Sequence, residues 1–552
     1  MAPAAPKPAA PSLPEAHPGA GAVLSPVSSW DPEKVGSSTK ERDDYVATMQ
    51  RDINCLSDAD RTTRRTALQR LVVRLLKGDA MAPKPSPALL QAVLLGPLLA
   101  PVVRLLSDPV EKCREVALEL LLAAASQVPD VPALLPSLVP ALVLRMGLLP
   151  VAEPTEEVRL SIARLLEGPL IRRSGAAISS FAGDVSKVLC RGLEDPFPEI
   201  KKASCQGVME LVVVADPAAL EPHTEPLCRA LLVAASHQHS RVRQAALGAL
   251  GQLVRSTGCT QDLLEGALVP GLKPLVGDPI PLVRTAASQC IALWLGAGQG
   301  ARYDPDLWTA PLLPLLLLGL TDEAESAAEE TLRMLEGTGA AWAGRQQQRG
   351  GDGAGATGRT GSEEESQDEL QAAQLPRPFS GAPPAAARAM VRALLAQLLP
   401  PLLRELREWT VALRAASARV LSSTIILAGR GLTPHLDSLI PALCTAMGDD
   451  DPTVAQLALQ AVHVLGALLP AKDWLPLATD CACSGRPLPP AVSCARCPLK
   501  AARIGDLTPP LLCFAASKRP GGPLGPAASV LPGGAPCPWG LGGCLCLRPL
   551  LR

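Results

Sequence analysis

Four cysteines near the C-terminal end have the spacing of a zinc site. Cys481 and Cys483 form a Cys-x-Cys pair, and Cys494 and Cys497 form a Cys-x-x-Cys pair. Four thiolates can bind zinc tetrahedrally, but structural zinc sites normally lie in a small ordered scaffold. No strand or helix-cap signals flank these cysteines, so we expect no metal site here. We also expect no other cofactor.

Two histidines and a glycine-rich stretch are the other candidates for chemistry. His237 and His239 could contact a metal, but the remaining histidines are scattered and a solvated turn is the simpler interpretation. Gly350–Gly361 lacks the preceding strand, the following helix and the terminal Lys-Ser/Thr of a phosphate-binding loop. Nucleophile elbows and paired-histidine metal motifs are also missing. The sequence therefore predicts a protein that is not an enzyme.

The most regular polar feature is an acidic residue followed six positions later by a basic one. Asp278-Pro279 with Arg284 is the clearest copy. Successive basic residues lie 45, 42, 42 and 41 positions apart, at Arg114, Arg159, Lys201, Arg243 and Arg284. In one copy His237 takes the place of the acid. This regularity indicates a repeat of about 42 residues.

Each repeat carries the signals of two helices. Apolar residues return at helical spacing after the acid, as in Val242, Ala246 and Leu253, and another apolar stretch precedes it. Because an acidic side chain can cap free N–H groups and proline suits a first turn, we expect Asp-Pro to start the second helix. Neither helix can bury its apolar face alone. The sequence therefore predicts an all-α fold, an α-solenoid of stacked helix pairs.

The composition agrees with this fold and limits the classes of partner that the protein can bind. Aromatic residues make up 2% of the chain, whereas sheets and single-strand nucleic-acid sites depend on them. Lys and Arg number 52 against 53 Asp and Glu, so the basic excess of nucleic-acid binders is missing. The apolar stretches Val131–Val151 and Pro311–Leu320 are interrupted by prolines and an arginine or are too short to span a bilayer. We expect protein partners, no nucleic acid and no membrane.

Shifts in composition divide the chain into five parts. They are a Pro/Ala-rich disordered leader at 1–41, repeats at 42–336, a flexible Gly-rich and acidic insertion at 337–384, further repeats at 385–478 and a Cys/Pro/Gly-rich tail at 479–552. The leader lacks a signal peptide's apolar run, so we expect a cytoplasmic protein. Ser362 precedes three glutamates, which suits an acid-directed kinase or a plain solvated linker. The tail is expected to be unstructured or the product of a misread gene.

The repeat resembles the HEAT repeat, also described as armadillo-like. In HEAT proteins the acid and the base six residues apart form a ladder of polar contacts between neighbouring repeats. The resemblance assigns the acidic side of the ladder to Asp58, Asp108, Glu153, Asp195, Asp278 and Glu408. It assigns the basic side to Arg64, Arg114, Arg159, Lys201, Arg243, Arg284 and Arg414. These residues are expected to cap and align helices.

Two stretches narrow the resemblance further. Asp58–Leu68 looks like the first repeat of the HEAT-repeat dynein axonemal assembly factors. Leu403–Leu421 is similar to a repeat of that family in which an acid-Trp pair, here Glu408-Trp409, precedes the arginine. The resemblance covers residues 42–478. It implies a cytoplasmic factor for the pre-assembly of outer and inner axonemal dynein arms of cilia or flagella. Such a factor would hold dynein chains, such as intermediate chains, together with other assembly factors and chaperones.

Periodicity alone leaves other HEAT scaffolds open, namely a nuclear transport receptor, a phosphatase regulatory subunit or a tubulin-binding array. Transport receptors usually have many more repeats than the roughly ten here. Tubulin-binding arrays would display basic residues and tryptophan in successive turns, where this chain has residues such as Gly277 and Ser107. We expect a monomer. We also expect four tryptophans in apolar helical stretches to be buried: Trp294, Trp308, Trp409 and Trp474.

Overall fold

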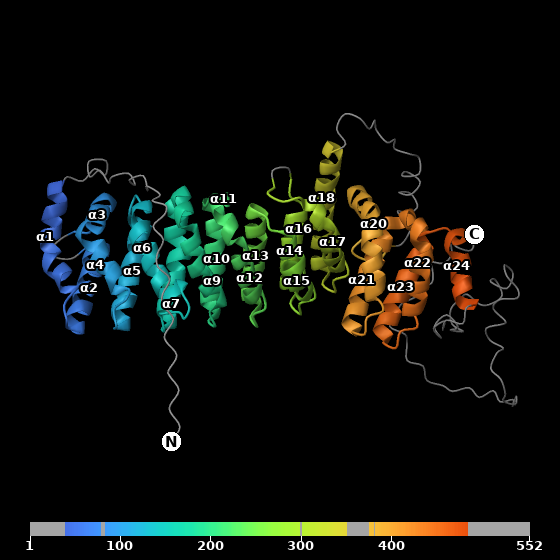
Figure 1. Ribbon diagram of the computed structural model, residues 1–552, viewed down its shortest axis with the longest axis horizontal. Coiled ribbons are helices and arrows are strands. Elements are labelled where there is room, and N and C mark those ends of the chain that lie inside the picture. The colour runs from blue at the N-terminus through green and yellow to red at the C-terminus, as the bar shows by residue number, and fades with distance from the viewer. Residues whose placement is uncertain (1–38, 79–82, 299–300, 350–374, 380, 484–552) are drawn as a thin grey trace, which may run out of the picture. The chain divides into compact units, whose positions relative to one another are not determined.

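The structure is a computed structural model that describes residues 39–78, 83–298, 301–349, 375–379 and 381–483. Every regular element in these ranges is a helix (Figure 1). The α-helices of the N-terminal half are α1 Thr39–Cys55, α2 Arg61–Leu76, α3 Pro87–Val93, α4 Leu99–Leu105, α5 Glu111–Gln127, α6 Leu135–Leu142, α7 Glu156–Leu165, α8 Ile171–Ser174, α9 Ala182–Glu194, α10 Pro198–Val214, α11 Pro217–Leu220, α12 Thr224–Ala235 and α13 Ser240–Thr257. Those of the C-terminal half are α14 Gln261–Leu263, α15 Val269–Val276, α16 Pro281–Leu295, α17 Pro305–Gly319, α18 Glu325–Arg349, α20 Ala385–Glu405, α21 Val411–Ala428, α22 Leu436–Ala446, α23 Pro452–Leu468 and α24 Ala471–Cys483.

Short segments of other helix types join several of these α-helices. The 3-10 segments are Pro132–Leu134, Gly175–Phe181, Glu221–His223 and Gly429–His435, and the π-helical turns are Leu94–Leu98, Val143–Gly147, Leu166–Leu170 and Leu264–Leu268. Two of the π-helical turns contain a Gly-Pro pair, at Pro97 and Pro169. Proline lacks the N–H that an α-helix needs, so the chain kinks at these points.

The chain divides into two compact units, residues 1–101 with 127–129 and residues 102–126 with 130–552. In the described part of the first unit, α1 and α2 bury Met49, Leu68 and Leu71. The Arg74 guanidinium on α2 donates a hydrogen bond to the carbonyl of Thr48 on α1 at 2.6 Å. The α1 and α2 helices therefore form an antiparallel pair with a leucine-rich core.

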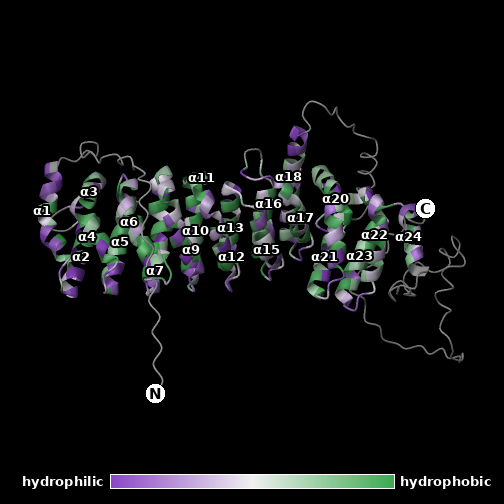
Figure 2. Cartoon of the chain, viewed as in Figure 1, coloured by the Kyte–Doolittle hydropathy of each residue, from purple (hydrophilic) through white to green (hydrophobic). Residues whose placement is uncertain are grey.

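The second unit is a row of helix pairs. Each first helix packs on its own second helix, as α9 does on α10, α12 on α13 and α15 on α16, and the second helices α10, α13 and α16 pack side by side. The core contains Leu, Ala and Val, with Leu250, Ile291 and Trp294 fully buried. The predicted all-α solenoid is confirmed. Figure 2 shows hydrophilic residues along α1 and at the C-terminal end of α18, among other places.

The start of the second helices differs from the prediction. Each begins three residues after the ladder acid, for example at Pro281 after Asp278 and at Glu111 after Asp108. The acid accepts a hydrogen bond from the backbone N–H two residues later, which closes a turn before the helix. The proline of Asp-Pro therefore lies in this turn and not in the first helical turn.

Three expected boundaries are wrong. The first helix, α1, begins at Thr39, inside the leader expected at 1–41. The repeat pattern was expected to stop at residue 336, but α18 continues to Arg349 because Arg345 and Arg349 bind the first turn of α17 at Asp306. One glycine of this part of α18, Gly339, serves close packing. A Cβ on Gly339 would lie 2.6 Å from the backbone nitrogen of Ala387 on α20. At the other end, the helical structure runs beyond residue 478, because α24 extends to Cys483.

Among the residues that the structure describes, three helical stretches are long and apolar enough to cross a membrane by length and composition alone, Pro87–Leu105, Ala385–Glu405 and Val411–Ala446. Between 50% and 56% of the most apolar window of each is buried inside the protein. The shorter apolar helix α17, expected to pack, buries Leu312, Leu313 and Leu316. Packing between helices therefore accounts for much of this apolar surface.

Candidate functional site

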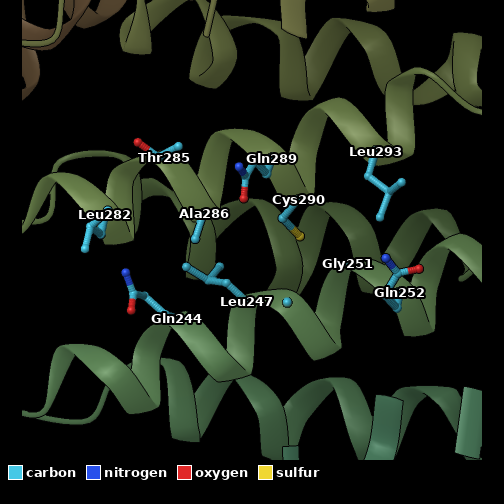
Figure 3. A pocket seen from close by; sticks show the side chains of 11 residues that line it. Gln244, Leu247, Gly251, Gln252, Leu282, Thr285, Ala286, Gln289, Cys290 and Leu293 are labelled. Carbon is cyan, nitrogen blue, oxygen red and sulfur yellow. The ribbon is translucent and has the colours of Figure 1, made fainter. Parts of the chain in front are cut away.

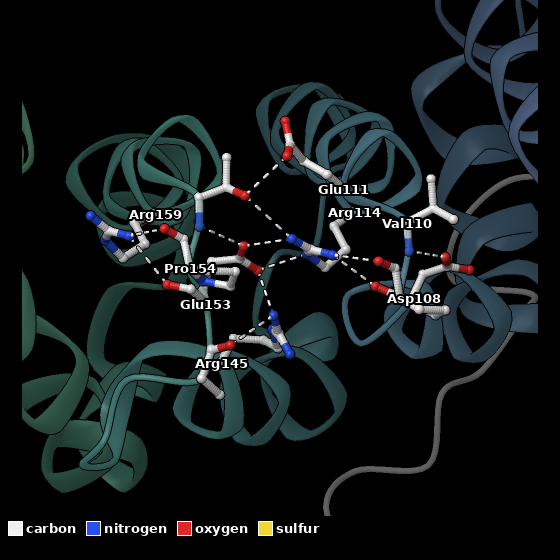
Figure 4. A network of polar contacts seen from close by, with 11 residues as sticks. Asp108, Val110, Glu111, Arg114, Arg145, Glu153, Pro154 and Arg159 are labelled. Atoms are coloured by element: carbon white, nitrogen blue, oxygen red, sulfur yellow. Dashed lines mark hydrogen bonds and ion pairs between the residues drawn. The ribbon is translucent and has the colours of Figure 1, made fainter.

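The ladder residues of the second unit are linked in groups by polar contacts, and in the group drawn in Figure 4 Glu153 has the most partners of the carboxylates. Its carboxylate accepts hydrogen bonds from Arg114 of the preceding repeat at 2.8 Å and from Arg145 at 2.6 Å. It also accepts one from the backbone N–H of Thr155 at 3.2 Å. Burial alone would raise the pKa of Glu153, but the hydrogen bonds from the two arginines and Thr155 lower it below its ordinary value.

Each ladder arginine makes two kinds of contact. Its Nη1 donates to the carbonyl oxygen six residues earlier at 2.7 to 3.2 Å, as at Arg64, Arg114, Arg159, Arg243, Arg284 and Arg414. In the second unit its other guanidinium nitrogens bind the acid of the following repeat, and we call each such pair a rung. The rungs measure 2.6 to 2.8 Å and are Arg114–Glu153, Arg159–Asp195, Arg243–Asp278, Arg284–Asp322 and Arg414–Asp449.

The acids also have two functions. The acids of the five rungs bind an arginine, and their carboxylates and those of two earlier acids accept the backbone N–H two residues later at 2.7 to 3.2 Å, as at Asp58, Asp108, Glu153, Asp195, Asp278, Asp322 and Asp449. Glu408 is different. It is exposed, and within the described residues its carboxylate has no hydrogen-bond partner. A rung thus links the helix start of one repeat to the second helix of the repeat before it.

Two rung acids and one base were not among the predicted ladder residues. Asp322 and Asp449 belong to repeats that have lost their own base, so the search for acid–base pairs passed over them. The spacing could have identified them. Asp322 follows Arg284 by 38 residues and Asp449 follows Arg414 by 35, and in the other rungs the acid follows the arginine by 35 to 39 residues. No spacing in the sequence identifies Arg145. It lies in the π-helical turn Val143–Gly147, which comes close to Glu153 only in the folded chain.

In the described part of the chain, Glu408 forms no rung because the preceding repeat has Ala328 at the place of the base, and no rung forms between α10 and α13 either. Lys201 is buried and its Nζ donates to the carbonyl of Leu193 at 2.5 Å. The ring of His237 takes the place of the carboxylate, and its Nδ1 accepts the backbone N–H of His239 at 3.1 Å. Burial and the nearby Lys201, His239 and Arg243 lower the pKa of His237.

The residues that the sequence analysis considered for metal binding, phosphate binding or phosphorylation lie in three parts of the chain. His237 and His239 lie with ring centroids 5.1 Å apart in a turn, and no group of three or more metal-binding side chains occurs in the part of the chain that is described. Cys481 is buried in α24. Cys494, Cys497, Gly350–Gly361 and Ser362 lie outside the described residues.

The tryptophan prediction is wrong at Trp409. Trp294 and Trp308 are buried as expected, at 0% and 2% exposure, and their rings meet edge to face. Trp409 is 89% exposed because it lies in the turn before α21 and not in a helix. Trp474 is half-buried. An exposed tryptophan on a protein surface is a common contact residue in protein interfaces.

A groove lies between the second helices α13 and α16 (Figure 3). Its volume is about 380 Å³. The lining residues are uncharged: Gln244, Leu247, Gly248, Gly251, Gln252, Leu282, Thr285, Ala286, Gln289, Cys290 and Leu293. Leu282, at one end, is 67% exposed. The groove offers amides above an apolar floor, which suits contact with a polypeptide better than with a charged small molecule.

The sequence profile of a family described as "Dynein axonemal assembly factor 5-like, TPR repeats" matches residues 55–348, more than half of the chain. The chain belongs to this family. A second profile, "Dynein axonemal assembly factor 5, HEAT-repeat domain", matches residues 372–483. The predicted resemblance to the dynein axonemal assembly factors is confirmed.

Relatives in the family are similar over most of this chain. Dynein axonemal assembly factor 5 of Xenopus laevis is 28% identical over 439 residues, covering 79% of this chain and 48% of the relative. That of Homo sapiens is 28% identical over 454 residues, covering 80% and 49%. The chain thus spans about half the length of these relatives. Among solved structures, importin beta has a TM-score of 0.39 at 16% identity, covering 77% of this chain and 54% of that chain.

Proposed function

We propose that this chain is a non-enzymatic scaffold for the cytoplasmic pre-assembly of axonemal dynein arms, outer and inner. It holds dynein chains, among them intermediate chains, together with other assembly factors and chaperones before the arms enter cilia or flagella. The observation that carries this proposal is the match of two profiles of dynein axonemal assembly factor 5 along residues 55–348 and 372–483.

The form of the protein supports a binding role. A solenoid of helix pairs exposes long helix faces that can contact an extended surface of a partner. The α13–α16 groove lies on such a face, and Trp409 is exposed in a turn between two helices. Because each repeat contacts only its neighbours, the chain needs no second copy to bury its core, and we propose that it acts as a monomer.

Affinity purification from cells that are growing cilia tests the proposal. The tagged chain is expressed beside an unrelated HEAT-repeat protein with the same tag, and proteins recovered from the cytosolic fraction are identified by mass spectrometry. Recovery of axonemal dynein intermediate chains above the control is the expected result. Recovery of importins, phosphatase subunits or tubulin without dynein chains would overturn it. Light scattering after size exclusion measures the oligomeric state.

A further inference from the structure

The α13–α16 groove presents unused hydrogen-bonding groups along its length. Gln244 and Gln252 on α13, and Gln289 and Thr285 on α16, line it, and within the described residues none of these side chains has a hydrogen-bond partner. A glutamine amide both donates and accepts. An extended polypeptide backbone offers N–H and C=O groups in alternation. The three glutamine amides can therefore hydrogen-bond to a peptide backbone whatever its side chains are.

The floor of the groove is shaped by glycine. A Cβ on Gly248 would meet no atom within 4 Å, so the space above this residue is open. Figure 3 shows Gln244 and Leu247 on one helix facing Ala286 and Gln289 on the other. Glycine in a helix is unfavourable relative to alanine, and it allows another backbone to approach closely. The groove thus has room for a backbone directly over α13.

Charge occurs only at the two ends of the glutamine row. Arg241 and Arg255 lie three residues before Gln244 and three residues after Gln252, which places both on the same stripe of α13. Within the described residues neither arginine has an ion-pair partner. Between them no ionised side chain lines the groove, so a charged residue of a ligand would lose water there without gaining a partner.

We propose that this groove binds an extended peptide segment with an uncharged middle and an acidic residue at each end. At 1.5 Å per residue the two arginines are about 21 Å apart along α13. An extended chain covers this distance in about six residue steps, so the two acids are the first and seventh residues, whose side chains point to the same face. The glutamines pair with the backbone, small apolar side chains face Gly248 and Ala286, and the two acids meet Arg241 and Arg255. The proposal rests on the proposed function in taking the partner to be a protein.

Fluorescence anisotropy with two labelled, end-blocked heptapeptides tests this specificity on the full chain. The probe is Glu-Ala-Val-Ala-Val-Ala-Glu and its counterpart is Lys-Ala-Val-Ala-Val-Ala-Lys. We expect the probe to bind at least about tenfold more tightly than its counterpart. The double variant R241E/R255E should reverse this order. No saturable binding of the probe, or equal binding of the two peptides, would overturn the proposal.

Gly248→Phe blocks the groove in a position where the structure leaves room for a side chain. Its matched control is Gly337→Phe on α18, another helical glycine with no atom within 4 Å of a built Cβ. Circular dichroism confirms that both variants fold. We expect Gly248→Phe to weaken probe binding at least about tenfold and Gly337→Phe to leave it unchanged. Equal binding by both variants would contradict the proposal.

Purification of dynein chains with the same variants separates the two proposals. If the wild-type chain and Gly248→Phe recover dynein chains equally and the probe does not bind, the groove proposal fails and the assembly function stands. If the probe binds with the expected order but no dynein chains are recovered, the groove proposal stands and the assembly function fails.

Discussion

Replacing Glu153 with glutamine tests how much a buried rung stabilises the contact between two repeats. The Glu153 side chain is 0% exposed, and its partners Arg114 and Arg145 are 6% and 15% exposed. Removing one partner of a buried ion pair costs about 3–5 kcal/mol, because the other charge stays buried without compensation. Glutamine keeps the shape and one carbonyl acceptor. We therefore expect the free energy of local opening to fall by about 3 kcal/mol, the low end of that range.

Amide hydrogen exchange on α5 and α7 measures this loss locally, which suits an array whose repeats can open separately. A loss of about 3 kcal/mol corresponds to exchange roughly a hundredfold faster. The control is Glu156→Gln, an exposed carboxylate on the same turn of chain. If the two variants exchange at equal rates, the rung does not stabilise this contact and the reasoning is refuted.

The pH dependence gives a second test of the same rung. Hydrogen bonds from Arg114, Arg145 and Thr155 outweigh burial and hold the pKa of Glu153 below its ordinary 4.5. The folded protein therefore binds its proton less readily than the unfolded chain, and stability falls as the pH drops through the folded pKa. The difference in stability between wild type and Glu153→Gln, followed by urea unfolding, should be constant above about pH 5 and shrink below it. A difference that stays constant to pH 3 would contradict this.

Three further changes follow from individual environments. Arg284→Ala should lower stability by about 1–3 kcal/mol in thermal melts, since Asp322 loses its charged partner; an unchanged Tm would show that the pair contributes nothing. Trp294→Ala should cost about 3–5 kcal/mol while Trp409→Ala leaves the Tm unchanged, because only the first ring is buried; equal losses would contradict the burial. In His237→Asp, Lys201 gains an acid nearby, so the Tm should rise. The lowered pKa of His237 makes wild type lose stability as the pH falls below about 6.5, and the variant should lose less between pH 7.5 and 5.5.

The repeat length and the helix pairs were predictable because the acid of each repeat both caps the turn before its own helix and binds the arginine of the preceding repeat. Asp278 must lie three residues before its own helix and within reach of Arg243, and Arg284 must reach back to the carbonyl of Asp278. These requirements fix both the six-residue spacing and the repeat length. Burial was not predictable at Trp409, because a residue next to a helix start has the same sequence neighbours whether it points inward or outward. The groove was not predictable either, since Gln244 and Gln289 lie in different repeats and only helix packing brings them together.

Where the rung between α10 and α13 is missing, the residues at its two positions, Lys201 and His237, suit each other chemically. An arginine at position 201 would bring several N–H donors into a buried place where the next repeat offers no carboxylate, and unpaired buried donors are costly. Lysine brings three N–H donors on one nitrogen instead of the five of arginine, and the carbonyl of Leu193 accepts one of them at 2.5 Å. On the other side, the turn still needs an acceptor for the N–H of His239, and Nδ1 of His237 supplies it without a charge. A neutral imidazole beside Lys201 thus preserves the helix start while giving up the link between repeats. The contact between α10 and α13 therefore depends on apolar packing to a greater extent than the contacts at the five rungs.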